Sequence, residues 1–276
     1  MGTLYVVATP IGNLEDISLR ALRVLREARL IAAEDTRATR RLLARYDIAT
    51  PLTSYFEHNK LAKLEQLLAA VEAGDVALVS EAGMPGISDP GYELVAAAIA
   101  RGLAVVPVPG PSAVVTALAV SGLPTDQFVY LGFLPRRAAE RRRALAEAAL
   151  EPRTLVAYEA PHRLRASLAD ALTTLGDRRM AAARELTKLH EEVVRGTVSE
   201  VLAHFGQHEP RGEFTLVFAG RPRGEAAPDP EAARARLAEL RRQGHSGREA
   251  VDQVAAETGL PRREVYKLWL ALDTAP

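Results

Sequence analysis

The sequence predicts an α/β protein with a parallel sheet in its first half, a mixed α/β second half and a small helical C-terminal domain. Patterns of strand, loop and helix repeat in that order over residues 4–120, which is typical of a parallel sheet. The second half has further strand and helix patterns, and we expect some antiparallel pairing there. A Gly/Pro-rich linker at 220–230 precedes a helical tail. A length of 276 residues suits two domains and a small third one.

The strands of the first half are short apolar runs, and the helices show apolar residues at a helical period. We expect strands at 4–8, 30–33, 76–79 and 104–108. Helices are expected from Ser18, from Asp35 or Thr36, over 61–73, from Gly91 and from Ser112. Asp35 or Thr36 is the predicted N-cap of the second helix, because short polar side chains cap helices well.

Three of these strands end in loops rich in glycine, proline and short polar residues, at 9–13, 80–90 and 109–113. In a parallel sheet such loops emerge at the carboxyl edge, where ligands of open α/β sheets bind. Asp89 is the only acid after Glu81 in its loop. Capping the helix from Gly91 is its simplest role, but the convergence of the loops favours a ligand contact.

In the second half, strands are expected at 128–131, 154–158, 180–183, 192–198 and 214–219, and helices up to 150, at 163–175 and at 199–205. In the tail, Ala255, Gly259 and Val265 have the spacing of a helix-turn-helix, with Arg262, Arg263 and Lys267 on the second helix. A small bundle that serves packing alone is the alternative for this tail. The predicted domains are 1–124, 125–222 and 231–276.

Composition excludes several classes of protein. The chain has no cysteine, so it has no disulfide framework and no thiolate nucleophile. The His residues are not paired at ligand spacing, and we expect no metal site. No apolar run approaches the ~20 residues of a membrane span, and the N-terminus does not resemble a signal peptide, so we expect a cytoplasmic protein. The formal net charge is zero, so any affinity for nucleic acid must come from local patches.

Several long motifs occur in order along the chain: LYVVATPIGNLEDISLRAL, AAEDTRATRRLL, SYFEHN, SEAGMPGISDPGYELV, VPVPGPSAVVTALAVSGLP, YLGFLPRR, YEAPHRL, RELTKLHEEVVRGT and EFTLVFAG. Through them, the chain resembles the ribosomal RNA small subunit methyltransferase I family, within the wider tetrapyrrole-methylase-like class of S-adenosylmethionine enzymes. The resemblance covers nearly all of residues 1–220, and the tail is similar to the family's C-terminal helix-turn-helix.

The resemblance implies 2′-O-methylation of a cytidine in 16S rRNA of the small ribosomal subunit, near the decoding centre. It also implies two α/β domains with S-adenosylmethionine in the cleft between them, commonly in a homodimer, and the 30S ribosomal subunit as partner. By resemblance to the class, the cofactor contacts are Pro10, Asp89, Tyr92, Ser112, Ala113, Glu159, Leu186 and Thr215.

The chain departs from the tetrapyrrole methylases in two loops. It has ATPIGN where they carry a G-x-G-P-G-like first loop, and SDPG after a longer SEAGMPGI where they have a compact G-D-P. These departures match the ribosomal branch. Two rival interpretations stay open: a methyltransferase acting on a tetrapyrrole-like small molecule, and a non-enzymatic nucleic-acid-binding regulator.

A general base could take the proton of the ribose hydroxyl. The sequence offers Glu34, Asp35, His58, Glu81, Glu159, His162 and Lys188. Each of these side chains also has an ordinary role, such as helix capping for Asp35 and surface charge for Lys188. Glu34, Asp35 and Glu81 are the preferred candidates, because their strand-end positions should face the crevice.

Clusters of arginine are the predicted phosphate contacts. Arg37, Arg40, Arg41 and Arg45 share one face of a helix. Arg136 and Arg137 begin a second cluster that continues through 141–143, and the tail supplies Arg262 and Arg263. The alternative for each cluster is a solvated helix face.

Overall fold

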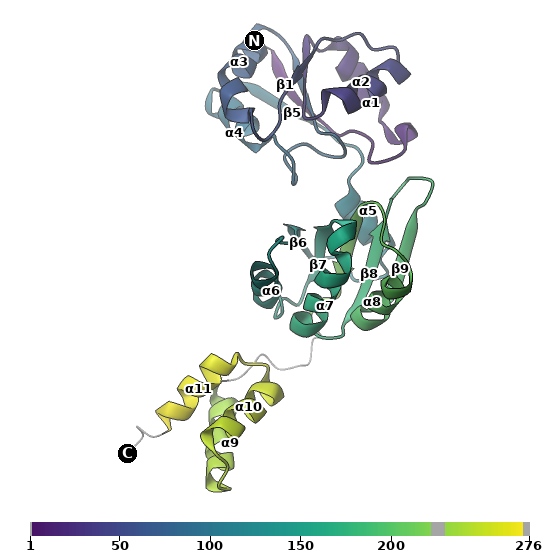
Figure 1. Cartoon of the computed structure of the whole chain (residues 1–276). Helices are drawn as coiled ribbons and strands as arrows, with labels where there is room; N and C mark the ends of the chain where they lie inside the picture. Colours follow the sequence, from purple (N-terminus) through teal and green to yellow (C-terminus); the bar gives the residue numbers. More distant parts are fainter. Residues whose placement is uncertain (1, 222–229, 273–276) are drawn as a thin grey trace. The chain divides into compact units, whose positions relative to one another are not determined.

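The computed structural model describes residues 2–221 and 230–272, except the side chain of residue 256. It divides into two compact units, a first unit of residues 1–221 and a second unit of residues 222–276. The first unit holds two five-stranded sheets, and the described part of the second unit is helical (Figure 1). The predicted linker falls mostly outside the described residues.

The first sheet is entirely parallel, in the order β3-β2-β4-β1-β5, as predicted. Its strands are β1 (Thr3–Val7), β2 (Leu30–Ala33), β3 (Leu52–Ser54), β4 (Val76–Val79) and β5 (Ala104–Val108). The helices of this half are α1 (Leu19–Glu27), α2 (Thr36–Arg45), α3 (Lys60–Ala73) and α4 (Tyr92–Ala100), with a 3-10 turn η1 (Leu14–Asp16). The strand β3 was not predicted, because its three half-buried residues make no apolar run.

Both faces of this sheet are buried, as parallel sheets require. On β4, Ala77 and Val79 join the core formed with α1 and α2, whereas Val76 and Leu78 join the core formed with α3 and α4. Successive side chains of a strand point to opposite faces, so an unbroken apolar run serves both layers. The loops at the strand ends are therefore held by a rigid two-sided core.

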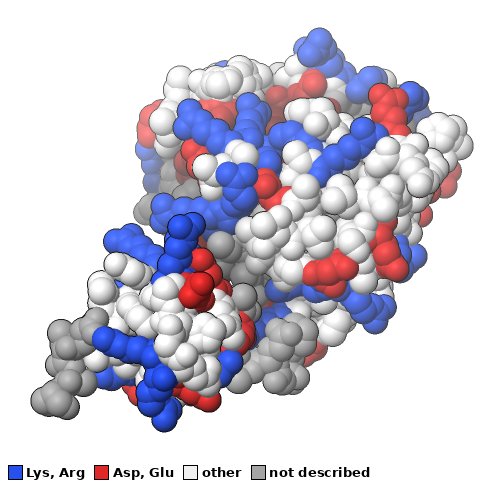
Figure 2. Space-filling model, turned by 60° about the horizontal axis from the view of Figure 1, so that its bottom comes forward, with Lys and Arg blue, Asp and Glu red and all other residues white. Residues whose placement is uncertain are grey.

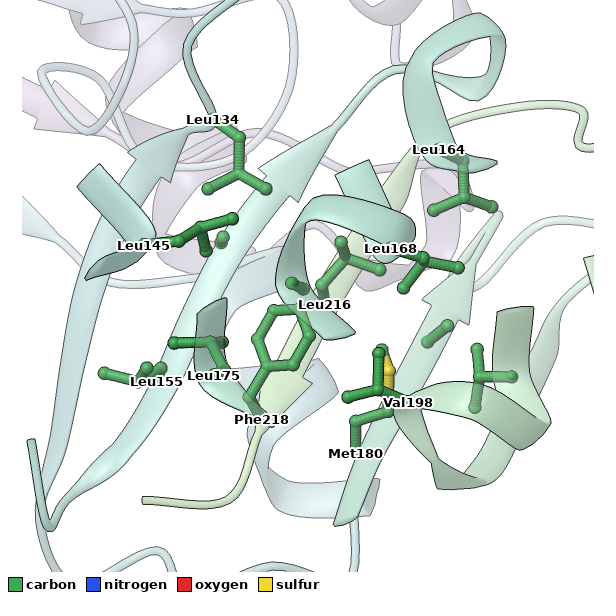
Figure 3. Close-up of a cluster of buried hydrophobic side chains, with 14 of the residues drawn as sticks. Leu134, Leu145, Leu155, Leu164, Leu168, Leu175, Met180, Val198, Leu216 and Phe218 are labelled. Carbon is green, nitrogen blue, oxygen red and sulfur yellow. The ribbon is translucent and has the colours of Figure 1, made fainter. Parts of the chain in front are cut away.

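The second sheet has the order β6-β7-β10-β8-β9 and is mixed, as predicted: β6 is parallel to β7 and the other pairs are antiparallel. Its strands are β6 (Phe128–Phe133), β7 (Thr154–Glu159), β8 (Arg179–Arg184), β9 (Glu192–Thr197) and β10 (Phe214–Phe218). Helices α6 (Ala138–Glu147), α7 (Leu164–Leu175) and α8 (Val198–Gln207), with a 3-10 turn η2 (Pro161–Arg163), cover one face. Figure 3 shows Leu145 of α6 and Leu168 and Leu175 of α7 in one cluster with Leu216 and Phe218 of β10.

The opposite face is covered by α5 (Ala113–Val120), whose Val114, Ala117 and Leu118 pack against strands of the second sheet (Figure 1). The predicted first domain, 1–124, includes this helix, so the predicted boundary differs from the packing. Helix α5 follows β5 in the chain, but its apolar face is buried on the other sheet. The chain therefore passes from the first sheet to the second in the loop 109–112 that precedes α5. The division into three domains stays a proposal.

The described part of the second unit consists of α9 (Pro230–Arg242), α10 (Gly247–Thr258) and α11 (Arg262–Ala271) around a core that includes Val251 and Val254. Gly259 ends α10 in the left-handed conformation, with φ of 68°, which suits a residue without a Cβ. Pro261 then begins α11. The predicted helix-turn-helix spacing thus corresponds to the α10–α11 pair.

Candidate functional site

A cavity of about 690 Å³ lies at the carboxyl edge of the first sheet, within the first unit. The first sheet lines it with residues that follow β1, β2, β4 and β5, which lie within 9–14, 34–42, 80–89 and 112–113. The second sheet lines it with the ends of β6, β7 and β8 and the start of β10. Because β10 is antiparallel to β7 and β8, its start lies beside their ends. The loops predicted to converge therefore meet a second set of strand ends.

Two glycines serve the contacts between these loops. Thr9 and Gly83 form a β-bridge in which Thr9 N donates to Gly83 O at 2.9 Å and Gly83 N donates to Thr9 O at 3.0 Å. Gly83 has φ of +81°, a conformation that other residues adopt with strain. A Cβ on Gly12 would lie 2.4 Å from Cγ of Lys188, on the second sheet's side of the cavity. Gly83 thus helps to join two loops of the first sheet, and Gly12 lets the loop after β1 approach the second sheet's side of the cavity closely.

Asp89 lies at the cavity with its carboxyl group partly buried. Burial, followed by the charge of Glu34, raises the pKa of Asp89 to about 7, and the side chain of Ser80 works in the opposite direction. Gly91, not Asp89, is the N-cap of α4. Asp89 is therefore not the cap of α4, and it forms part of the cavity wall.

Glu34 and Glu81 line the same cavity. Burial raises the pKa of Glu34, although a hydrogen bond from Glu81 N to Glu34 Oε2 (3.2 Å) lowers it in part, and the charges of Glu81 and Asp35 add to the rise. Glu213 also lines the cavity and its charge further raises the pKa of Asp89. Repulsion among these carboxylates favours a cationic ligand, whose charge would relieve it.

Asp35 does not line the cavity. Its carboxylate caps α2 by accepting from Arg37 N (2.7 Å) and Ala38 N (3.1 Å), and the hydrogen bonds from Ala38 and Arg37 lower its pKa. The preferred assignment of Asp35 as a general base is therefore wrong in this structure. Asp35 directly follows Glu34, but its side chain caps α2 instead of facing the cavity.

Lys188 lines the cavity, but it is a poor base. Burial lowers its pKa, and its hydrogen bonds to Glu185 (3.0 Å) and Glu213 (3.1 Å) outweigh burial and raise the pKa overall. It is protonated at neutral pH as a result. His58 and His162 are exposed and do not line the cavity.

All of the predicted cofactor contacts except Tyr92 line the cavity: Pro10, Asp89, Ser112, Ala113, Glu159, Leu186 and Thr215. Tyr92 is 72% exposed at the first residue of α4 and lies outside the lining. The loop that ends at Gly91 faces the cavity, but the first turn of α4 presents this ring to solvent. The structure thus separates Tyr92 from the other predicted contacts.

Glu159 is fully buried, and both oxygens of its carboxylate already have hydrogen-bond or ion-pair partners. Arg163 Nη2 lies 2.5 Å from one carboxylate oxygen, which also accepts from Ala160 N at 2.7 Å, and Ser167 Oγ donates to the other. Arg163 also donates from Nη1 to Leu134 O at 3.0 Å. The carboxylate therefore fixes the wall of the cavity around Ala160.

The predicted arginine contacts divide into several environments. Arg41 is exposed and lines the cavity, whereas Arg37 and Arg40 are exposed on the same helix outside the lining. Arg136 is exposed at the loop after β6, and Arg137 is paired with Glu140.

Arg141, in the same basic cluster, is buried and ion-paired with Asp170 at 2.6 Å, so its assignment as a phosphate contact is wrong. In the sequence Arg141 is one residue of a basic cluster, but the packing of α6 on α7 buries it. In the second unit, Arg262 is paired with Asp252 and Arg263 is exposed. Positive and negative side chains are interspersed on the face seen in Figure 2.

The sequence analysis did not assign Phe133 or Tyr158, which both line the cavity. Phe133 is 56% exposed, and its ring centroid lies 5.2 Å from that of Tyr158. Burial raises the pKa of Tyr158, so its hydroxyl stays protonated. Both aromatic residues occur in quoted motifs, GFLP and YEAP, at the ends of strands, which was the available signal.

No helix among the described residues is long and apolar enough to cross a membrane. Over 2–221 and 230–272, no group of three or more His, Asp or Glu side chains is arranged to hold a metal ion.

Comparison with known families gives two matches. Residues 3–202 match Tetrapyrrole (Corrin/Porphyrin) Methylases, and residues 226–273 match the RsmI C-terminal HTH domain. Together with the two sheets, these matches confirm the predicted fold class.

Curated proteins similar to the chain carry the name ribosomal RNA small subunit methyltransferase I. The protein from Synechocystis sp. is 49% identical, over 99% of this chain and 99% of its own. The protein from Halalkalibacterium halodurans is 48% identical, over 97% of this chain and 94% of its own. The match to the Thermotoga maritima protein is 50% identical and spans 222 residues, which is 80% of this chain and 100% of that protein.

Solved structures with the same fold are more distant in sequence. Uroporphyrin III C-methyltransferase from Thermus thermophilus is 22% identical, with a TM-score of 0.56 over 79% of this chain and 97% of its own. Another structure of the Thermus thermophilus enzyme, complexed with S-adenyl homocysteine, has a TM-score of 0.55. Diphthine synthase is 13% identical, with a TM-score of 0.61 over 79% of this chain and 90% of its own.

Proposed function

Because the chain belongs to the ribosomal RNA small subunit methyltransferase I family, we propose that it transfers the methyl group of S-adenosylmethionine to the ribose 2′-oxygen of a cytidine in 16S rRNA. The observation that carries this proposal is the cavity shared by the two sheets, with Asp89, Glu34 and Glu81 in its wall. The same resemblance extends the proposal to the 30S subunit as substrate, near its decoding centre, and to a cytoplasmic homodimer.

The residues of the cavity suit this cofactor. A volume of about 690 Å³ lies in the range of ~300–1,000 Å³ typical of small-molecule sites. The acidic wall suits a ligand that carries a sulfonium and an ammonium group. We assign Pro10, Asp89, Ser112, Ala113, Leu186 and Thr215 as its contacts, and Glu159 as the residue that fixes the wall beside it.

When bound, S-adenosylmethionine supplies an electrophilic methyl group on sulfur. The chain's own task is to hold the 2′-oxygen in line with that methyl group, and positioning of this kind removes much of a reaction barrier. Glu34 is the better candidate to accept the hydroxyl proton, because burial of its carboxylate raises its pKa. Glu81, exposed at the same wall, is the second candidate.

A methyl-transfer assay with labelled S-adenosylmethionine tests the proposal against its rivals. Purified 30S subunits, naked 16S rRNA and a tetrapyrrole are offered side by side. We expect label in the rRNA, resistant to alkali at one nucleotide because the 2′-oxygen is blocked. Label in the tetrapyrrole would favour the small-molecule enzyme, and absence of transfer to any acceptor would favour the non-enzymatic regulator.

Removal of residues 222–276 is expected to leave cofactor affinity unchanged and to raise KM for 30S subunits by about tenfold, which corresponds to ~1.4 kcal/mol of binding free energy. The second unit has its own core, so the first unit keeps its packing. The match to all of the Thermotoga maritima protein spans only 222 residues, so we expect kcat to change little. Steady-state kinetics separates the two constants, and an unchanged KM would show that the tail takes no part in recognition.

Replacing Arg40 and Arg41 together by Gln is expected to weaken rRNA binding and to flatten its salt dependence. Each lost phosphate contact lowers the log–log slope by close to one unit on duplex and somewhat less on single strands. Filter binding across a salt series measures the slope, and calorimetry checks that cofactor affinity is unchanged.

The matched control replaces Arg20 and Arg23, which are exposed on α1 and outside the cavity lining. An equal slope in wild type and the α2 variant would assign these arginines to a solvated face.

A further inference from the structure

We propose that Phe133 is the positioning residue on which the base of the target nucleotide stacks, an inference that rests on the proposed function. Phe133 lines the cavity and is 56% exposed; Leu14 (40%) and Ile87 (47%) are also exposed there, but the other aromatic residues of the lining, Tyr158 and Phe214, are half-buried or buried. Three features support this role: a bulge in β6 that turns the ring into the cavity, hydrogen bonds that hold the following loop, and the position of the base on a ribose bound in the cavity.

A one-residue bulge in β6 decides the direction of the ring. Tyr130 pairs with Val156 and Phe133 with Tyr158, so β6 advances three residues while β7 advances two. Strand side chains alternate between faces, so without the bulge Phe133 would lie on the opposite face from Tyr130. Gly132 takes up the extra residue with φ of 70°.

The bulge brings three aromatic rings onto one face. The centroid of Tyr158 lies 5.4 Å from that of Tyr130 and 5.2 Å from that of Phe133. Tyr130 Oη is 2.6 Å from Ser88 Oγ, in the loop that carries Asp89. The exposed ring of Phe133 is therefore supported from one side and joined to the acidic wall of the cavity.

The loop after Phe133 is held by two arginines, of which Arg141 is buried and Arg163 is half-buried. Arg163 donates to Leu134 O at 3.0 Å, and Arg141 donates to Pro135 O and to Arg136 O, each at 3.3 Å. Leu134 itself is 2% exposed. A ring anchored in this way loses little conformational freedom when a base stacks on it.

The chemistry of the substrate places a base near this ring. The reacting 2′-oxygen and the base are attached to adjacent carbons of the ribose, so a ribose that enters the cavity brings its own base to the wall. Arg136, three residues after Phe133, is exposed and can meet a phosphate of the same strand. Aromatic stacking and basic side chains in series are the usual means of holding single-stranded RNA.

The test compares Phe133→Leu, Phe133→Ala and Phe133→Tyr in methyl transfer to 30S subunits. Loss of stacking should raise the half-saturating concentration of 30S subunits by about 5- to 150-fold in the Leu and Ala variants. The Tyr variant should stay within about twofold of wild type, because it keeps the ring. Affinity for S-adenosylmethionine, measured by calorimetry, should be unchanged in all three.

Phe128→Leu is the matched control, since Phe128 is a partly exposed aromatic residue of the same strand outside the cavity lining. Wild-type behaviour of Phe133→Leu would overturn the inference, as would a loss of cofactor affinity, which would place the ring against S-adenosylmethionine. Either result leaves the proposed function intact, because the wild-type protein still methylates rRNA in that experiment. A wild-type protein that fails to methylate rRNA overturns both.

Discussion

Replacing Asp89 by Asn is expected to weaken S-adenosylmethionine binding by about 12- to 150-fold and to stabilise the unliganded protein at about pH 8. A hydrogen bond or close contact to a charged group contributes ~1.5–3 kcal/mol, and the variant loses the charge while keeping the shape. Calorimetry measures the affinity and thermal unfolding measures the stability.

The pH dependence of the stability follows from the raised pKa. The carboxyl of Asp89 has a pKa of about 7 in the folded protein against a usual value of 3.8. The folded state therefore holds this proton more tightly, and the resulting stabilisation is complete below about pH 3.8. It is lost as the pH rises from 3.8 to 7, and above 7 the ionised group costs stability. The Asn variant lacks that cost, and we expect a gain of ~1 kcal/mol at about pH 8 after allowance for solvent screening.

The same group gives cofactor binding its own pH dependence. A cationic ligand lowers the pKa of Asp89, so binding near pH 7 should release a proton. Affinity should therefore fall as the pH decreases from about 8 to about 6, and less so in the variant. Asp126→Asn, an exposed position outside the cavity, is the control. If both substitutions leave cofactor affinity at the wild-type level, Asp89 is not a cofactor contact.

Replacing Arg163 by Met is expected to lower the free energy of unfolding by about 3–5 kcal/mol, because it leaves the buried carboxylate of Glu159 without its counter-ion. Adding Glu159→Gln to that variant should recover part of the loss. The Gln side chain carries no charge, its oxygen can still accept from Ala160 N, and its NH2 group can donate to Ser167 Oγ. Denaturant unfolding of wild type and the two variants provides the measurement.

The matched control is Arg143→Met, because Arg143 has an ion pair with Glu147 but is 84% exposed. Exposed pairs contribute about 0–1 kcal/mol. A similar loss in both Met variants, or a double variant no more stable than Arg163→Met, would contradict a buried ion pair as the source of the effect.

The order of strands, loops and helices could be predicted well because each depends on a local pattern. The run at 76–79 is apolar without alternation, which is the pattern of a strand buried on both faces, and it became the central strand β4. Gly259 was predicted as a turn residue, and it is the left-handed end of α10. The strand β3 was missed because its three residues carry no period.

The cavity could be located from the sequence only as a set of loops. Its first wall follows from the rule that parallel strands end at one edge, which is why the predicted loops lie together. The second wall depends on the antiparallel position of β10 beside β7 and β8, and no local pattern encodes that arrangement. Glu213 and Thr215 line the cavity for this reason.

The sequence by itself determined the family, the parallel sheet and the position of Asp89 in a strand-end loop. Those features depend on residue types, on spacing, and on motifs that lie within one segment of the chain. Only the tertiary structure decided that Asp35 lies outside the cavity lining, that Arg141 is buried against Asp170, and that Phe133 faces the cavity. Each of those outcomes depends on a one-residue change of direction or on packing between distant segments, and spacing along the chain specifies neither.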